Sequence, residues 1–317
     1  MMPARTIIPL LIVCLVFLNK LHAQVVRRDS IEGGAVVTLT DVVVRSGTDV
    51  KGFISRVKAD TTFYKAFRNL RVLGFTSLND VRVLGHSGSV KASSYSRTRQ
   101  TVAHGCRHTE KLSEEVKGDF YEDDGSYRYY TAQLYSGLFF AFDTVCGETN
   151  IVKGMERSVE GKSGLDKHKE QLKMLFFNPG ARIPGIPLMG NKAAVFDPSN
   201  TKLYDFSIDI ENYNGRTVYL FTVKAREDLS SADRDLIVID RMVTRFDYLN
   251  FDVLSRQYSM SYDAGVYHFN VSMDVELERW GSHLLPRVIR YTGDWGVLFK
   301  KKEDCVFTAT LFDFVEK

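Results

Sequence analysis

The chain has 317 residues, with 42 Lys and Arg against 39 Asp and Glu, and 44% of its residues are hydrophobic and 12% aromatic. This composition excludes a disordered chain, which would have few aromatic residues and a high net charge. The formal net charge of +3 gives no electrostatic reason to expect nucleic-acid binding, because that affinity depends on clustered basic residues. No motif identifies a chemical reaction, so the function has to be inferred from compartment and architecture.

The first 23 residues have the features of a secretory signal peptide. Arg5 precedes an apolar run over residues 7–18, and a Leu-His-Ala sequence then offers a small residue for cleavage after Ala23. The run of about 12 residues is too short for the ~20 residues that cross a membrane as a helix. We therefore expect an exported protein in the periplasm or at the periplasmic face of the outer membrane. Peripheral contact with that membrane is compatible with this expectation.

Cleavage would leave three cysteines, Cys106, Cys146 and Cys305. In an exported protein two of them can form a disulfide bond while the third remains a thiol, but the spacing does not choose the pair. His104, Cys106 and His108 form an H-x-C-x-H sequence, which would begin a metal site only with further ligands that the sequence does not supply. We expect no metal and no cofactor.

Two helices are predicted after residue 47. From residue 48 to about residue 70 apolar residues such as Phe53 and Val57 recur every three or four positions. A shorter helix is expected over about residues 165–176, where Asn178-Pro179-Gly180 ends it. Residues 24–47 are predicted to be an extended segment with one or two strands, and residues 48–317 a single domain.

The rest of the chain is predicted to be mainly β. Apolar and polar residues alternate between residues 75 and 142, with a hairpin signal at Asp124-Gly125, and alternate more strictly over residues 203–314, with a turn at Asn214-Gly215. No long helix separates these strands, so the sheet should be antiparallel. Two helices cannot cover so long a sheet. We therefore expect a strongly curved sheet, a half-barrel, with one long and one short helix in its concave side.

Four segments within residues 45–314 carry a family resemblance: DVKGFISRVKADTTFYKAFRNL, CRHTEKLSEEVKGDFYEDDGSYRYYTAQLY, MLFFNPGARIPGIPLMGNKAAVFD, and YDFSIDIENYNGRTVYLFTVKA followed by RDLIVID. Their order resembles the periplasmic lipoprotein-carrier (LolA-like) half-barrel superfamily, and more closely exported Bacteroidota proteins of unknown function. The resemblance implies an apolar concavity that binds acyl chains, without catalytic residues. This chain is longer than the carriers of that superfamily.

An apolar groove is the site that the sequence favours. The candidate residues fall in two runs, a dense one and a proline-rich loop that would act as a lid: Leu138, Phe139, Phe140 and Phe142, then Ile183, Ile186, Leu188 and Met189. Methionine and aromatic side chains adapt well to alkyl chains. We therefore predict a non-enzymatic binding protein for a lipid, an acyl chain or a lipidated partner. The same residues would be ordinary core if the interior were fully packed.

Two other functions stay open at this point. Asp274, Glu276 and Glu278 share one face of a strand, so a secreted jelly-roll-like carbohydrate hydrolase could use Glu276 and Glu278. A solvated outer face explains the same row without catalysis. The third interpretation is an envelope scaffold with a packed interior and no ligand. A G-H-S-G-S sequence at residues 85–89 predicts a hairpin turn, because a strand follows it instead of the helix of a nucleophile elbow.

Overall fold

The computed structural model describes residues 42–44, 50–152, 174–183, 189, 191–265, 267–297 and 302–316. All of them belong to the same structural unit, Val37–Lys317. The predicted signal peptide, and residues 165–173 of the second predicted helix, lie outside the described residues.

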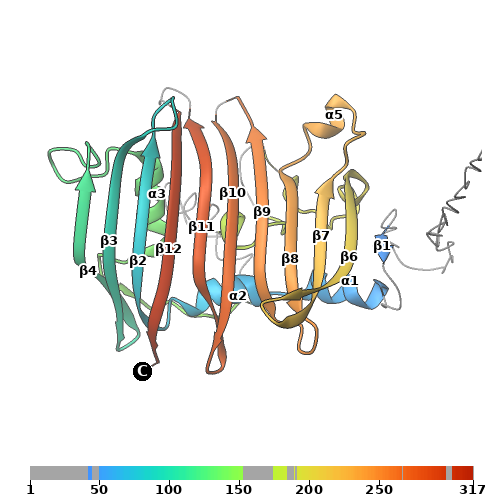
Figure 1. The fold of residues 1–317 in the computed structure, drawn as a ribbon, viewed down its shortest axis with the longest axis horizontal. Helices are drawn as coiled ribbons and strands as arrows, with labels where there is room; N and C mark the ends of the chain where they lie inside the picture. The colour runs from blue at the N-terminus through green and yellow to red at the C-terminus, as the bar shows by residue number, and fades with distance from the viewer. Residues whose placement is uncertain are drawn as a thin grey trace, which may run out of the picture. The chain divides into compact units, whose positions relative to one another are not determined.

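Strands make up most of the described chain (Figure 1). The helices are α1 (Val50–Ala59), α2 (Thr62–Asn69), α3 (Tyr130–Phe139), the 3-10 turn η2 (Thr201–Leu203) and α5 (Ser231–Arg234), and residues 174–177 are also helical. The strands are β1 (Val42–Val44), β2 (Gly74–Leu84), β3 (Val90–Ala103), β4 (Cys106–Lys117), β5 (Val145–Cys146), β6 (Tyr204–Tyr213), β7 (Arg216–Ala225), β8 (Ile239–Asp247), β9 (Val253–Asp263), β10 (Tyr267–Trp280), β11 (His283–Val297) and β12 (Glu303–Val315).

The strands form one open sheet in the order β1-β6-β7-β8-β9-β10-β11-β12-β2-β3-β4-β5. Strands β6 to β12 are an antiparallel meander, and β12 then pairs with β2, which places the C-terminal strand beside the strand that follows α2. Only β1 among these strands runs parallel to its neighbour, β6. The predicted antiparallel sheet is confirmed, as is a strand within the N-terminal segment.

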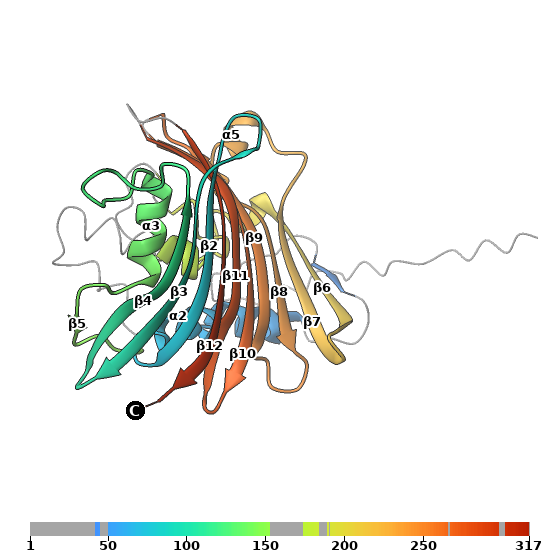
Figure 2. The same cartoon turned by 60° about the vertical axis from the view of Figure 1, so that its left-hand side comes forward.

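The sheet curves, and α1, α2 and α3 pack against the same face of it (Figure 2). Alternation along the strands decides which side chains meet the helices. On β10, Phe269, Val271 and Met273 are buried, whereas Asn270 and Ser272 between them are exposed. Since a strand side chain points to one face at every second residue, the period-two pattern of the sequence fixes the concave wall. The curved sheet holding helices in its concavity is as predicted.

The predicted long helix is bent into α1 and α2 at Asp60. The Asp60 carboxylate accepts hydrogen bonds from the backbone N–H of Thr62 at 3.1 Å and from its hydroxyl at 2.7 Å. The same carboxylate lies 3.9 Å from the guanidinium of Arg256 on β9, and both side chains are buried. The Asp60 carboxylate satisfies the first backbone N–H of α2 and so favours the start of a new helix there, while Arg256, a partner distant in sequence, holds that carboxylate in place.

Helix α3 differs from the prediction of a strand on each side of Asp124-Gly125. The turn is present, with Tyr121 bridged to Tyr127, but the chain becomes helical at Tyr130. The Glu303 carboxylate of β12 accepts hydrogen bonds from the N–H groups of Tyr130 at 2.9 Å and Thr131 at 2.8 Å. A carboxylate supplied from the sheet thus caps the helix and overrides the local strand pattern.

The cysteines divide as expected, into one disulfide and one thiol, and the structure now identifies the pair. Cys106 on β4 is bonded to Cys146 on β5, and these residues are direct partners across the two strands. Cys305 is a free thiol on the concave face of β12 and is 1% exposed.

Burial, followed by the nearby Glu303 carboxylate, raises the pKa of the Cys305 thiol to about 12. Because the thiolate is the reactive form, we expect the mature folded protein to give no reaction with a thiol reagent at pH 8. After unfolding without reductant, Cys305 alone should react, which a mass shift for a single label would show. Rapid labelling of the folded chain, or labelling of three cysteines on unfolding, would contradict this assignment.

Candidate ligand-binding site

A pocket lies between α3, residues 174–177 and the concave face of strands β10, β11 and β12. Apart from Thr131, the side chains that line it are apolar or aromatic: Leu134, Tyr135, Leu138, Phe139, Phe176, Phe177, Met273, Tyr291, Trp295 and Phe307. Its void is about 20 Å³, enough for roughly one water molecule. We call it the apolar pocket; it is narrow, and Leu134, Leu138 and Phe139 on its helix side are half-buried.

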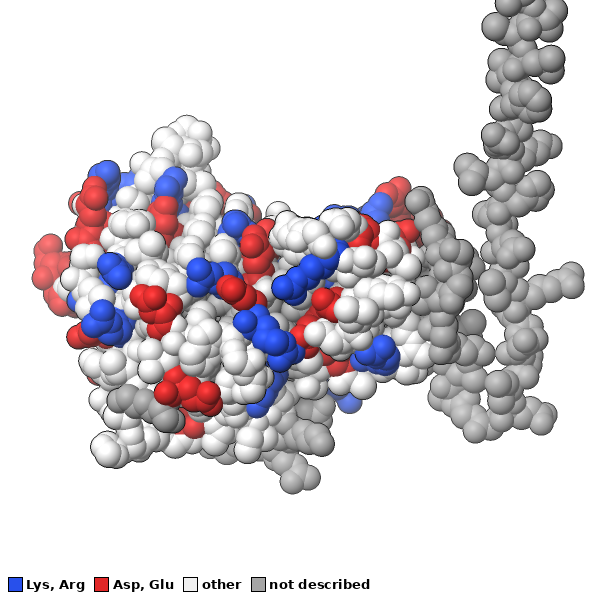
Figure 3. Space-filling model, turned by 60° about the horizontal axis from the view of Figure 1, so that its bottom comes forward, with Lys and Arg blue, Asp and Glu red and all other residues white. Residues whose placement is uncertain are grey.

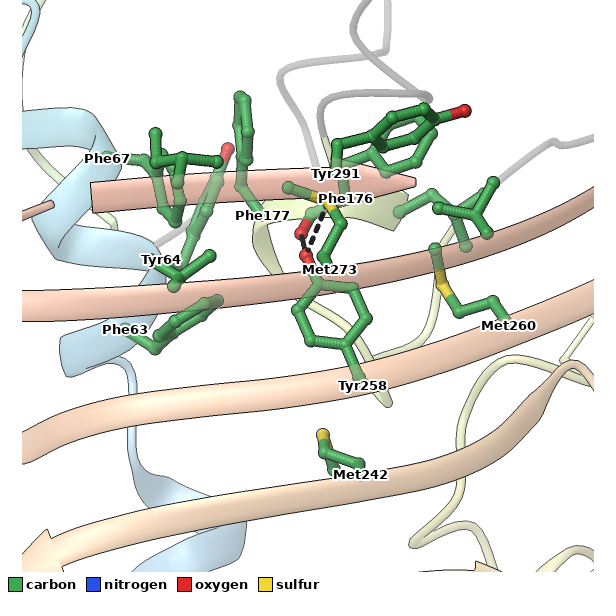
Figure 4. Close-up of a cluster of buried hydrophobic side chains, with 14 of the residues drawn as sticks. Phe63, Tyr64, Phe67, Phe176, Phe177, Met242, Tyr258, Met260, Met273 and Tyr291 are labelled. Atoms are coloured by element: carbon green, nitrogen blue, oxygen red, sulfur yellow. Dashed lines mark hydrogen bonds between the residues drawn. The ribbon is translucent and has the colours of Figure 1, made fainter. Parts of the chain in front are cut away.

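Aromatic rings make up much of the wall of the apolar pocket, and Figure 4 shows Phe67, Phe176, Phe177 and Tyr291 in this cluster. The rings of Tyr291 and Phe307 stack with centroids 4.6 Å apart on the sheet side. On the helix side Phe177 stacks on Phe67 of α2 at 4.1 Å and meets Phe139 of α3 at 5.6 Å. Phe177 therefore joins α2 to α3 across the pocket, and contacts of this kind contribute about 0.5–1.5 kcal/mol each beyond simple burial.

A buried tyrosine ties the helix at 174–177 to the sheet. The Tyr258 hydroxyl, from β9, donates to the carbonyl oxygen of Phe176 and lies 3.1 Å from the Met273 sulfur (Figure 4). Burial raises the pKa of Tyr258, so the hydroxyl stays protonated and remains a donor. This hydrogen bond sets the depth at which Phe176 enters the concavity.

A second pocket adjoins the first on the side of α2 and β4. It is lined by Tyr64, Phe67, Arg68, Leu70, Arg71, Gln100, Arg107, Leu138, Phe139 and Phe177, around a void of about 30 Å³. We call it the arginine pocket. Leu138, Phe139 and Phe177 line both pockets, so the same three side chains have an apolar space on one side and a cationic space on the other.

Gln100 orients one of these arginines. Its amide Nε2 donates to the carbonyl oxygens of Leu70 at 2.6 Å and Leu73 at 2.7 Å, at the C-terminal end of α2. Its oxygen accepts from Arg107 Nη1 at 3.1 Å. Gln100 is 3% exposed, and both its amide nitrogen and its oxygen are hydrogen-bonded. The Arg107 guanidinium is therefore held in one orientation toward the pocket.

Residues 145–152, which we call the strap, run beside the arginine pocket. Cys146 fastens the strap to β4 through its bond to Cys106. Two residues further on, Glu148 Oε1 lies 3.1 Å from Arg71 Nη1, and Glu148 Oε2 accepts from Arg107 Nε. One carboxylate thus bridges two guanidinium groups from different parts of the fold.

The strap is also bound to α2. The Thr149 carbonyl accepts from Arg68 Nη2 at 2.5 Å, and the Asn150 side chain donates to Asn69 Oδ1 at 2.9 Å. The Asn150 carbonyl accepts from Lys65 Nζ at 2.5 Å. These bonds hold the strap between β4 and α2 at the edge of the arginine pocket.

The first run of sequence-predicted site residues lies at the C-terminal end of α3. Leu138 and Phe139 line both pockets. Phe140 packs on Tyr135 at 5.5 Å and on Phe142 at 5.1 Å, outside the pocket linings. Phe142 is 37% exposed.

The second run lies partly outside the described residues. Ile183 and Met189 are 2% and 1% exposed and belong to the apolar core. Ile186 and Leu188 lie outside the described residues. The predicted lid therefore stays a prediction.

Sequence reasoning missed the cationic half of the site. Arg68 falls on a polar side of the predicted helix, Arg71 follows that helix, and Arg107 falls in a segment rich in charged residues. Each looks like an ordinary solvated charge. The one signal in the sequence is that Arg68 directly follows Phe67, on a helix expected to face the concavity.

The carboxylate row of β10 lies on the outer face and is neutralised there. Asp274 and Glu276 both pair with Arg290, at 3.3 Å and 2.6 Å, and Glu278 pairs with Arg287 at 3.3 Å. Acidic and basic side chains are also interspersed on the side of the molecule drawn in Figure 3. These contacts account for the row as a solvated outer face, and the hydrolase interpretation gains no support from them.

Two sequence motifs have structural explanations. Residues 85–89 turn the chain from β2 into β3, with the Gly85 N–H donating to the Ser89 carbonyl at 2.8 Å, as predicted. In the H-x-C-x-H sequence the sulfur of Cys106 is used by the disulfide, so it is not available as a metal ligand.

Comparison with known proteins gives no sequence relative. No family model matches the chain, and no curated protein matches it. Among the described residues no helix is long and apolar enough to cross a membrane.

Solved structures give distant likenesses. A putative outer membrane lipoprotein-sorting protein domain from Vibrio parahaemolyticus has a TM-score of 0.27 at 8% identity, covering 80% of this chain and 90% of that one. A DUF1329 family protein from Desulfovibrio piger has a TM-score of 0.23 at 10% identity, with coverage of 81% and 94%. Likenesses with TM-scores this low carry no argument about function.

Proposed function

We propose that this chain is a non-enzymatic exported protein that binds a lipid, an acyl chain or a lipidated partner at the periplasmic side of the cell envelope. The observation that supports this most is the apolar pocket, whose walls come from two helices and a curved sheet and are almost entirely hydrocarbon. Each CH₂ group transferred there from water would contribute about 0.8 kcal/mol. An alkyl chain of about ten CH₂ groups would therefore gain enough free energy to bind, even after the cost of widening the pocket is subtracted.

The pocket has to widen before it can hold an alkyl chain. Glu303 fixes the N-terminal end of α3, and just beyond the other end Ala141 exchanges two hydrogen bonds with Thr109 of β4, at 2.7 and 3.0 Å. Between these anchors the side chains of Leu138 and Phe139 are only half-buried. In this proposal a rotation of these two side chains separates Phe139 from Phe177 and joins the two voids.

Export is supported by the disulfide. A Cys106–Cys146 bond between adjacent strands persists in oxidising compartments and is rare in the cytosol. The predicted signal peptide over residues 1–23 agrees with this, and its cleavage after Ala23 would be shown by the N-terminal sequence of the secreted protein.

We expect Leu138→Trp to reduce uptake of a fluorescent fatty acid by about tenfold or more, because the indole would fill the space that an alkyl chain needs. The measurement is fluorescence titration of the delipidated mature protein with cis-parinaric acid. Leu249→Trp is the matched control, since Leu249 is 91% exposed in a turn. Equal uptake by both variants and the wild type would remove the apolar pocket as the binding site.

An envelope scaffold without a ligand is the second candidate. It is favoured by the small size of the two interior voids, about 20 and 30 Å³ in the described part of the chain. The same titration separates the two proposals, because a scaffold would take up no probe in the wild type.

A further inference from the structure

We infer that the ligand carries an acidic head group, which Arg71 and Arg107 bind, and that Glu148 occupies this anion site when the ligand is absent. The inference rests on the proposed binding of an alkyl chain in the apolar pocket and specifies the chemistry of the other end of the ligand. Carboxylate and phosphate are the two head groups that this chemistry recognises.

The first support is how the anion site is built. Arg107 is 9% exposed and is fixed by the buried Gln100, which in turn is bound to the end of α2. Arg71 lies two residues beyond the last residue of α2, so both guanidinium groups are positioned by the same end of that helix. Guanidinium groups held in this way bind carboxylate and phosphate oxygens with good geometry.

The second support is the charge of the arginine pocket. Three of the described residues that line it are arginines and none is acidic. Among the described residues, the strap brings a negative charge to this pocket through Glu148, whose side chain is 18% exposed. A carboxylate delivered on a separate segment can be withdrawn without unfolding the wall of the pocket.

The third support is the position of the anion site beside the apolar pocket. Leu138, Phe139 and Phe177 separate the two spaces, so an amphiphile could place its chain on one side and its head group on the other. When such a head group replaces Glu148, one anion takes the place of another at Arg71 and Arg107. The head group adds its ion pairs with Arg71 and Arg107 to the free energy gained from the buried chain, while the displaced Glu148 carboxylate regains its hydration in solvent.

The strap geometry suits an exchange of this kind. Glu148 lies two residues from Cys146, whose disulfide to β4 stays in place while the side chain swings out. The displaced carboxylate would move to solvent, and the strap would remain tethered and ready to return.

The test compares cis-parinaric acid with its methyl ester on the delipidated mature protein. The two probes share one chain and differ in charge. We expect the acid to bind about tenfold more tightly than the ester, as is typical for a charge-assisted hydrogen bond. Competition by dodecanoate and by dodecyl phosphate then shows which acidic head group is preferred.

Three variants show which residues cause the preference for the acid over the ester. Glu148→Gln should strengthen binding of the acid several-fold, because it removes the competing anion, and Arg107→Gln should remove the preference for the acid while ester binding persists. Glu227→Gln is the control, because Glu227 pairs with Lys224 on the surface and its side chain is 82% exposed.

Equal binding of acid and ester by the wild type, with Glu148→Gln altering neither, would overturn the head-group inference and leave the proposed function standing. Uptake of neither probe would overturn both. The wild-type comparison needs no substitution, so a variant that fails to fold does not affect it.

Discussion

Replacing Arg256 by methionine should lower the free energy of unfolding by about 3–5 kcal/mol, because it leaves the buried Asp60 carboxylate without its cation. The Asp60 and Arg256 side chains are 6% and 8% exposed and lie 3.9 Å apart. Arg256 also donates to Thr244 Oγ1 at 2.9 Å and covers the Phe63 ring at 4.4 Å. Urea unfolding followed by circular dichroism measures the loss.

Two further variants test the cause. Asp60→Asn keeps an oxygen for the start of α2 but removes the charge, so the double variant Asp60→Asn/Arg256→Met should be more stable than Arg256→Met alone. Arg82→Met breaks an exposed pair with Asp80 and should cost at most about 1 kcal/mol. A similar loss for Arg82→Met and Arg256→Met would show that burial of the pair is not what matters.

Removing the disulfide should lower the free energy of unfolding by about 4 kcal/mol, the value that loop-closure entropy gives for a loop of this length. The bond closes a loop with a sequence separation of 40 residues. The suitable variant is Cys106→Ser/Cys146→Ser, which leaves no new thiol. Its strap should also be held less firmly, since Glu148 and Asn150 would lose their covalent anchor.

The control for this prediction is chemical. Reductant should destabilise the wild type to the level of Cys106→Ser/Cys146→Ser and should have no effect on that variant. A difference below about 1 kcal/mol between the variant and the wild type would mean that the bond does not constrain the unfolded chain, against the loop-entropy argument.

The sheet could be predicted from the sequence because its information is local. Alternation along β10 and the turns at Gly85–Ser89 and Asn214-Gly215 each depend on neighbours in the chain. The start of α3 could not be predicted from the sequence, because the residue that caps it is Glu303. The bend at Asp60 could not be predicted either, because the partner of Asp60 is Arg256. In both cases a contact across the fold decides the local conformation.

The candidate site was predicted only in its apolar half. Leu138 and Phe139 could be found because they belong to a dense apolar run. Arg71, Arg107 and Glu148 look like solvated charges in sequence, and only the pairing of β4 with β5 and the end of α2 brings them together. Charge clusters built from separate loops leave no periodic trace in the sequence, so the meeting of Arg71, Arg107 and Glu148 could not be predicted.

Native mass spectrometry of the mature protein, purified from the envelope without detergent, tests the central claim most directly. The account predicts a population heavier than the polypeptide by the mass of an amphiphile, which is lost in Leu138→Trp and kept in Leu249→Trp. A wild-type protein that carries only its polypeptide mass, and stays so after incubation with fatty acid, would contradict it.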